Sequence, residues 1–312
     1  MASYDRHSAD RAGDAVFRGV SYLFALSVIA LMAFIFIVLL KESWPAVKKF
    51  GIGFIYSSSW DPVRLEFGAL PAIYGTVVSS LIAVIIAVPV SLGIAIFINE
   101  LSPRRMKGPI SAAIGLLASI PSIIYGMWGL FILAPFLAGH VEPRLDRYLG
   151  FIPLFRGSPM GIGMLSAGFI LAVMIIPFIS SVTRDIFQMV PPILKESGYA
   201  VGATRWEVVR KIVVPYTKSG IIGAVILGLG RALGETMAVT FVIGNSHKIS
   251  ASLLAPATSI SATLANEFTE AVEDIYLSSL VELGLILFLI TFAVLVTAKL
   301  LISRLSYQGG KL

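Results

Sequence analysis

Two charged side chains stand four residues apart inside a long apolar stretch. Arg231 and Glu235 lie near the middle of the run 219–243, which is otherwise rich in Gly, Ala, Leu, Ile and Val. A charge at the centre of a membrane helix costs about 2.5 to 3.5 kcal/mol, so such residues usually face a protein interior or a wet cavity. A guanidinium offers a planar fork of donors that matches the oxygens of an oxyanion, and a carboxylate can hold that fork in place. The pair therefore predicts an anion pathway.

The same pair has a structural interpretation. If 219–243 is one helix, the spacing of four puts Arg231 and Glu235 on one face, where they neutralise each other and fix helix packing. Gly223, Gly230 and Gly234 also share a face, and small residues let helices approach closely. We expect these glycines to mark close packing, and we favour the pathway for the charged pair because it lies in mid-membrane.

The composition places this stretch in a membrane. The chain is 57% hydrophobic and only 13% charged, whereas soluble domains carry about 25% charged residues. The net charge of +6 comes from basic residues scattered between apolar runs, which is the pattern of membrane topology and not of a nucleic-acid-binding face. The absence of cysteine excludes disulfides, thiolate metal sites and cysteine nucleophiles.

Apolar runs long enough to span a bilayer determine the predicted fold. A hydrocarbon core of about 30 Å needs roughly 20 apolar residues in a helix. Six runs qualify, at 20–40, 70–98, 110–137, 160–182, 219–243 and 277–302. We predict an all-α polytopic membrane protein. Its parts are an N-terminal tail at 1–18, a first span with its external loop at 19–68, a transmembrane core at 69–305 and a C-terminal tail at 306–312.

Lys and Arg determine the predicted orientation. An even number of spans places both termini on one side, and the side richer in Lys and Arg faces the cytoplasm. The residues assigned to that side are Arg6, Arg11, Arg18, Arg104, Arg105, Lys107, Arg184, Lys195, Arg205, Arg210, Lys211, Lys218, Lys299, Arg304 and Lys311. Both termini are therefore predicted to be cytoplasmic. The external connections at 41–68, 139–158 and 245–276 are either contact surfaces for an external partner or solvated loops.

The longest cytoplasmic connection, 184–218, predicts two short helices. The prolines at 191–192 are compatible with a helix start, and Gly202 fits the left-handed position that closes a helix. Thr204 and Glu207 form a Thr-x-x-Glu capping box at the start of the second helix. We expect that helix to end before Pro215, because proline disfavours helical geometry at the preceding residue.

The faces of these two helices suggest docking. In the first helix Glu196 and Ala200 share a face, and in the second Trp206, Val209 and Val213 form an apolar stripe. Such a pair suits a groove on another protein. Binding to lipid headgroups is the alternative.

This connection resembles the EAA loop of the inner-membrane permeases of bacterial ABC importers. The loop signature is Glu-Ala-Ala, three residues, Gly, nine residues, Ile, any residue, Leu, Pro. The chain matches it at Glu196, Gly202, Ile212 and Pro215. It departs from the signature at Ser197, Gly198 and Val214. The resemblance implies a type I ABC importer permease fold, in which this loop is the coupling helix that fits a cleft of the ATPase subunit.

A second resemblance concerns the cargo. The run GLGRALGETMAVTFVIGN at 228–245 resembles phosphate permeases among the ABC importers, most closely the type-C permeases of the phosphate-specific transport system. The likeness extends over 69–304, including ANEF at 265–268 and ELGLILF at 282–288. It implies that Arg231 and Glu235 take part in transport. It also implies a second permease chain, two ATPase subunits and an external phosphate-binding protein at the bacterial inner membrane.

The chain lacks an ATP-binding motif of its own. No Gly-x-x-x-x-Gly-Lys-Ser/Thr loop occurs, and the glycine-rich run 228–236 has no lysine. We therefore expect a transport subunit without enzymatic activity or bound cofactor, with ATP and magnesium held by a separate ATPase chain.

Three other functions compete with phosphate import. Permeases for sulfate, molybdate or tungstate carry similar GRALGE-like runs. An ion-coupled anion transporter or channel would need no cytoplasmic docking loop, and paired half-length repeats are not evident. An intramembrane enzyme is not indicated, because no His-Glu-x-x-His or Gly-x-Ser-x-Gly occurs and the histidines at 7, 140 and 247 are scattered.

Overall fold

The computed structural model describes the backbone of residues 2–309 and the side chains of residues 14–300 and 302. Over these residues the chain is helical, with two isolated bridges, Asp61 with Glu66 and Gly244 with Ala257, and no strand ladder. Six helical segments are long and apolar enough to cross a membrane, which confirms the predicted spans in number. The segments are Asp14–Phe50, Leu70–Leu101, Ser122–Leu149, Met164–Gln188, Arg205–Leu233 and Asp274–Leu300.

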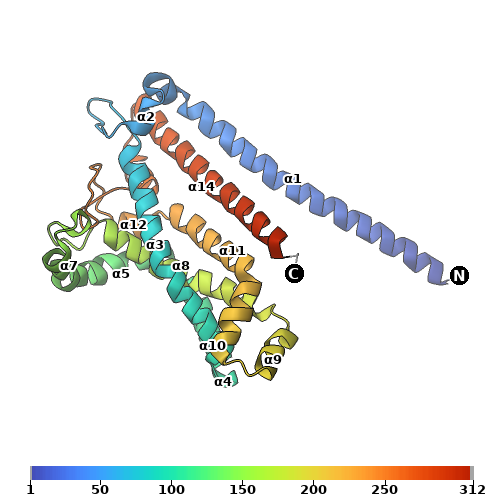
Figure 1. Cartoon of the computed structure of the whole chain (residues 1–312). Coiled ribbons are helices and arrows are strands. Elements are labelled where there is room, and N and C mark those ends of the chain that lie inside the picture. The colour runs from blue at the N-terminus through green and yellow to red at the C-terminus, as the bar shows by residue number, and fades with distance from the viewer. Residues whose placement is uncertain (1, 310–312) are drawn as a thin grey trace.

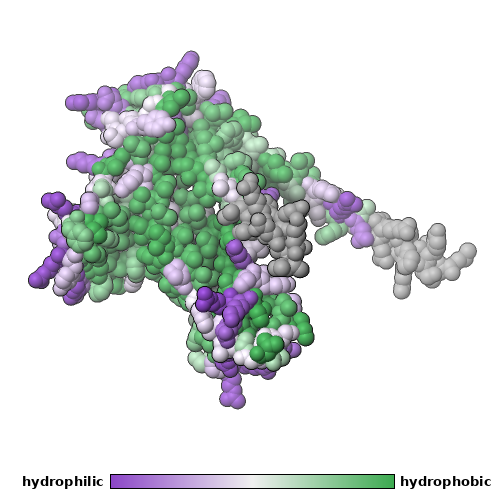
Figure 2. All heavy atoms as spheres, viewed as in Figure 1, coloured by the Kyte–Doolittle hydropathy of each residue, from purple (hydrophilic) through white to green (hydrophobic). Residues whose placement is uncertain are grey.

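The helices surround α8 (Met164–Gln188), the most buried of the six spans. α3 (Leu70–Ile96) packs along α8, and α11 (Val214–Leu233) contacts α8, α3 and α14 (Asp274–Gly309). α1 (Ala2–Phe50) runs beside α14 at the edge of the molecule (Figure 1). None of the residues in the most apolar stretch of α1 is buried within this chain. Hydrophobic residues cover the middle of the surface, and hydrophilic residues gather at its ends (Figure 2).

Short helices occupy the ends and connections. They are α2 (Gly53–Tyr56), α4 (Arg104–Ala118), η4 (Pro153–Phe155), α9 (Pro192–Ala200), α10 (Arg205–Val208), α12 (Met237–Thr240) and α13 (Ile260–Glu267). π-helical turns extend several spans. They are η1 (Phe97–Leu101), η2 (Gly129–Leu133), η3 (Leu137–Val141) and η5 (Val209–Val213).

The third span lies further along the chain than predicted. The run 110–137 is divided at Pro121, because proline favours extended geometry before it and ends the preceding helix. The first part belongs to α4, which buries no residue. The span itself is α5 (Ser122–Trp128), η2, α6 (Ala134–Phe136), η3 and α7 (Glu142–Leu149). The predicted external connection at 139–158 is therefore helical in its first half, through Leu149.

Other helix boundaries also differ from the prediction. α1 continues through Pro45 and ends at Phe50, and the next residue, Gly51, has φ +56°. The backbone of α1 begins at Ala2, so no break marks the predicted end of the tail at residue 18, and the side chains of residues 1–13 lie outside the described ones. Within α3 the chain stays helical through Pro89. At the other end α14 continues to Gly309, and residues 310–312 lie outside the described part.

Candidate functional site

The fifth span is broken beside the charged residues. α11 ends at Leu233, residues 234–236 are non-helical, and α12 begins at Met237, so the prediction of one helix over 219–243 is wrong. Glycine favours a helix end because it carries the largest backbone entropy. The Glu235 carboxylate accepts a hydrogen bond from the Ala238 amide at 3.3 Å, which satisfies one donor at the start of α12. Non-helical backbone at membrane depth occurs where it is buried in protein or lines a cavity.

Arg231 lies where three spans meet. Its guanidinium carbon is 5.9 Å from the centre of the Phe178 ring on α8, within cation–π range, and it interacts electrostatically with the Tyr125 phenol on α5. The Tyr125 hydroxyl donates to the Leu117 carbonyl at 2.8 Å. Arg231 and Glu235 are both half-buried.

The predicted ion pair between Arg231 and Glu235 is wrong. Over the described side chains, no carboxylate lies within ion-pair distance of Arg231. The physical reason is the break, because Glu235 follows the end of α11 and the spacing of four no longer places both on one helical face. The half-buried guanidinium therefore has no carboxylate partner among the described side chains.

The predicted glycine stripe is also wrong. A Cβ at Gly223 or Gly230 would come no nearer than 3.9 Å to a neighbour, which is ordinary contact. The close approach occurs instead at Gly220 and Gly228. A Cβ there would lie 2.7 and 2.6 Å from the side chains of Ile186 and Ile179 on α8. α11 therefore packs closely against α8 through Gly220 and Gly228, and not through the predicted Gly223 and Gly230.

A hollow borders the break, and no sequence pattern indicated it. Gly234 and Thr236 line a cavity of about 530 Å³ together with Ser261 of α13 and apolar residues of α1 and α14. Ser261 is buried, and its hydroxyl finds no hydrogen-bond partner among the described residues. The non-helical backbone at 234–236 thus faces open space on one side.

The connection after α8 begins as predicted. α9 closes in a Schellman motif, with the Gly202 amide donating to Tyr199 O at 2.9 Å and the Ala203 amide to Gly198 O at 3.1 Å. Gly202 has φ +85°, which confirms its left-handed position. The capping box is also confirmed. The Glu207 amide donates to Thr204 Oγ1 at 3.3 Å, and the Thr204 amide donates to the Glu207 carboxylate at 3.0 Å.

The second helix does not end before Pro215. α10 continues through the π turn η5 into α11, giving one helical segment, Arg205–Leu233. The π turn lets the Val214 amide donate to Val209 O, and the wider turn accommodates a proline that lacks an amide hydrogen. As a result, the signature residues Ile212 and Pro215 lie on the same helical segment as Arg231.

The matched signature residues lie at the surface of this connection. Glu196, Gly202 and Pro215 are exposed, and Ile212 is half-buried. Gly198 is buried, and a Cβ there would lie 2.7 Å from Ile212 Cδ1, so the end of the Ile212 side chain would shift to admit the alanine of the signature.

The apolar faces of the connection differ from the prediction at one position. Val209 and Val213 are buried, as is Val208, and Val208 and Val213 belong to one apolar cluster. Trp206 instead remains 63% exposed, and Tyr199 is also exposed, so two aromatic side chains of this connection face outward. Exposed aromatic residues of this kind are typical anchors for a protein partner.

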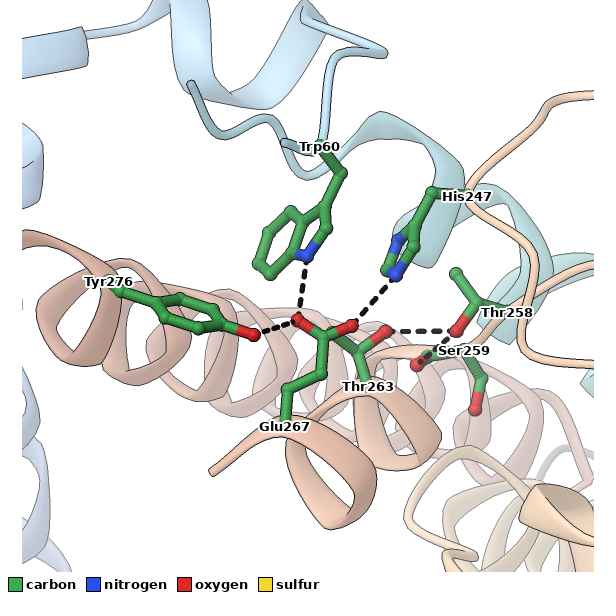
Figure 3. A network of polar contacts seen from close by, with 7 residues as sticks. All are labelled: Trp60, His247, Thr258, Ser259, Thr263, Glu267 and Tyr276. Carbon is green, nitrogen blue, oxygen red and sulfur yellow. Dashed lines mark hydrogen bonds and ion pairs between the residues drawn. The ribbon is translucent and has the colours of Figure 1, made fainter. Parts of the chain in front are cut away.

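A carboxylate network joins the loops at the opposite end of the molecule (Figure 3). Glu267 of α13 accepts hydrogen bonds from Trp60 Nε1 and the Tyr276 hydroxyl, both at 2.7 Å, and bonds to His247 Nε2 at 2.8 Å. The indole of Trp60 stacks on the His247 ring at 5.1 Å. Beside Glu267, the hydroxyls of Thr258 and Thr263 are 2.9 Å apart (Figure 3). The histidine that looked scattered in the sequence therefore has a structural role.

This network predicts pH-dependent stability. Burial alone would raise the pKa of Glu267, but the hydrogen bonds from His247, Tyr276 and Trp60 outweigh it, so the pKa lies below its usual range. A carboxyl with a depressed folded-state pKa stabilises the fold above its ordinary pKa, and this contribution is lost as pH falls through the folded value. We expect Glu267→Gln to lower the unfolding free energy by about 1–3 kcal/mol at pH 7.

The measurement is thermal unfolding of purified protein in detergent between pH 7 and pH 3. The difference between wild type and Glu267→Gln should shrink toward the acid end of the range. Glu273→Gln, at an exposed position six residues away, is the matched control and should behave as wild type. An effect of Glu267→Gln that stays constant with pH would contradict the account.

A family model described as the inner membrane component of binding-protein-dependent transport systems matches residues 7–307. The chain belongs to this family. It is accordingly a multi-pass inner-membrane transport component and not an enzyme, as the sequence predicted.

Curated relatives cover nearly the whole chain. The phosphate transport system permease protein PstC of Mesorhizobium japonicum is 56% identical over 301 residues, covering 95% of this chain and 92% of the relative. The PstC of Haemophilus influenzae is 51% identical, covering 96% of each chain. The PstC of Xylella fastidiosa strain 9a5c is 54% identical, covering 93% of this chain and 92% of its own.

Solved structures show the same fold at low identity. A bacterial alginate ABC transporter, in complex with an alginate-bound periplasmic protein, aligns with TM-score 0.59 and 17% identity, covering 89% of this chain and 92% of that one. The inward-facing MetNI methionine ABC transporter aligns with TM-score 0.53 and 18% identity, covering 78% and 95%. The predicted type I ABC importer permease fold is confirmed.

Proposed function

We propose that this chain is a permease subunit of an ATP-driven importer that carries inorganic phosphate across the inner membrane. The observation that carries the proposal is Arg231, whose guanidinium lies at a break in the fifth span without a carboxylate partner over the described side chains. Such a group can donate charge-assisted hydrogen bonds to a passing oxyanion. The names of the relatives point to the same cargo.

The proposed partners follow from what the chain contains and lacks. The exposed signature residues Glu196 and Gly202, with Ile212 and Pro215, would contact an ATPase subunit, one of a pair that holds ATP and magnesium. A second, related permease chain would complete the pore. An external phosphate-binding protein would deliver the anion, in the manner of the periplasmic protein that accompanies the alginate transporter.

The proposed cycle uses the continuity of Arg205–Leu233. Closure of the ATPase pair would push on the 184–218 connection and open the pore to the outside. Phosphate would then pass Arg231, with Glu235 holding the break in place through the Ala238 amide. ATP hydrolysis would return the pore to an inward-facing state. Because Arg231 is only half-buried, it would meet the anion transiently and release it.

Uptake with competing anions tests the cargo. Cells that lack their own phosphate importers should regain uptake of labelled phosphate when they express this chain with its partners. Excess sulfate, molybdate or tungstate should leave that uptake unchanged. Loss of phosphate uptake in the presence of one of these anions would favour the permease for that oxyanion instead.

The proposed orientation is tested by cysteine labelling, because the chain has no cysteine of its own. Ser197→Cys, on exposed α9, should react with an impermeant maleimide only after the cells are permeabilised. Ser58→Cys, exposed on the opposite end, is the matched control and should react in intact cells. Labelling of Ser197→Cys in intact cells would overturn the assignment of the termini and of the 184–218 connection to the cytoplasm.

A further inference from the structure

A shielded ion pair joins α9 to the end of α3. Lys195 Nζ lies 2.5 Å from an oxygen of Glu100, which belongs to the π turn η1. The two residues are 95 positions apart in sequence. Neither belongs to the loop signature or to the candidate anion site.

The exposure of this pair distinguishes it from the others. Its side chains are 8% exposed at Glu100 and 22% at Lys195. In every other Lys or Arg pair with Asp or Glu over the described side chains, at least one partner is 59% exposed or more. Exposed pairs hold their geometry weakly, whereas separating a shielded pair leaves a charge unpaired in a poor solvent. The contact therefore fixes the distance between α9 and η1.

Neighbouring contacts strengthen the connection at the same place. Ala95 of α3 is buried in one apolar cluster with residues of the 184–218 connection, among them Val190 and Val208. The Asn99 side-chain amide donates to the Arg184 carbonyl at 2.9 Å. π turns recur at functional positions, and here the turn carries both Asn99 and Glu100.

α3 leads from this contact toward the elements around the break. Near its other end, a Cβ on Gly75 would lie only 1.7 Å from the Thr258 carbonyl oxygen, so the two backbones touch. The Thr76 hydroxyl accepts a hydrogen bond from the Ile260 amide at 2.9 Å. Ile260 begins α13, which lines the cavity beside residues 234–236. α3 is therefore in direct contact with the start of α13.

We propose that the Glu100–Lys195 ion pair is a positioning contact that transmits movement of α9 to α3 during transport. The proposal rests on the proposed function, because it takes α9 as the surface on which the ATPase acts. Neither residue would touch the anion. Their role is to make the end of α3 move together with α9.

Hydrogen exchange of the assembled complex tests this link directly. The complex of both permeases and the ATPase pair is compared with and without a non-hydrolysable ATP analogue. In wild type, the analogue should change amide exchange in both 192–200 and 97–101. In Glu100→Gln, the change in 192–200 should remain and the change in 97–101 should be lost. Uptake should fall by roughly 2- to 30-fold, the range expected when coupling is weakened and not abolished.

Two further variants make the test specific. The reversed pair, Glu100→Lys with Lys195→Glu, should restore the exchange change in 97–101 and recover uptake. Lys107→Gln removes another cation that contacts η1, through the Asn99 carbonyl at 2.5 Å, but it comes from α4 and not from α9. It should leave the exchange response of 97–101 to the analogue intact.

The outcomes separate this proposal from the assignment of cargo. If the analogue still changes amide exchange of 97–101 in Glu100→Gln, the proposed link between α9 and α3 is overturned. The link is also overturned if the reversed pair fails to restore the exchange change in 97–101. A wild-type complex in which the analogue leaves 192–200 unchanged would contradict ATPase docking at α9, and the link with it. Because exchange does not depend on the transported anion, a finding that the cargo is sulfate would leave the link standing.

Discussion

Arg231→Gln is expected to reduce phosphate uptake by about 10- to 100-fold while the protein still inserts into the membrane. The guanidinium supplies charge-assisted donors, each contributing about 1.5–3 kcal/mol, and a neutral amide cannot replace them. Arg231→Lys keeps the charge but loses the planar fork, so it should retain intermediate uptake. The measurement is initial uptake of labelled phosphate, normalised to the amount of membrane-inserted protein.

Two controls separate transport from packing. Phe178→Leu removes the ring beside the guanidinium. It should reduce phosphate uptake only a few-fold, since a cation–π contact contributes about 0.5–2 kcal/mol. Glu235→Gln keeps Arg231 and changes only the group that accepts from the Ala238 amide, so it should retain more transport than Arg231→Gln. A packing role of Arg231 predicts less membrane-inserted Arg231→Gln protein, with normal uptake per inserted molecule. Normal uptake per inserted molecule in Arg231→Gln would remove Arg231 from the mechanism.

Gly202→Pro is expected to abolish uptake and weaken association with the ATPase, without loss of membrane insertion. Proline cannot adopt φ +85° and has no amide hydrogen for the bond to the Tyr199 carbonyl. Both changes act on the turn between α9 and α10, so the exposed surface of Glu196 and Trp206 would lose its shape. Co-purification with the ATPase subunit and uptake are measured on the same preparations.

Gly202→Asn is the matched control at the same position. Asparagine tolerates left-handed geometry better than other side chains, and no atom lies within 4 Å of a Cβ placed there. It should therefore keep most of the uptake and most of the ATPase association. Normal uptake in Gly202→Pro would contradict docking through this turn.

Hydropathy and local signals predicted the coarse architecture because both depend on neighbours in sequence. Runs of apolar residues are sufficient to locate six spans, and the Schellman and capping motifs at Gly202 and Thr204 are formed by residues at most five positions apart. The rule that proline ends a helix holds at only some of the prolines. Pro121 breaks its helix as the rule predicts, while Pro45 and Pro89 stay within helices and Pro215 is accommodated by a π turn.

The site itself depended on features that sequence patterns do not carry. The break at 234–236 lies inside a run that is apolar on both sides, so hydropathy indicated one helix and placed Glu235 on the same helical face as Arg231. The Glu267 network joins Trp60 and Glu267 across 207 residues, and the Glu100–Lys195 pair spans 95. Such contacts arise from packing of whole helices, and no local periodicity indicates them.

The proposed transport is ATP-driven passage of phosphate through a pore that contains this chain. Its most direct test is uptake by proteoliposomes that hold this chain, its partner permease and the ATPase pair, with the binding protein and labelled phosphate on the opposite side from ATP. Uptake should require ATP with magnesium and the binding protein, and it should fall in Arg231→Gln. Uptake driven by an ion gradient without ATP would contradict this proposal and would make the chain a secondary transporter.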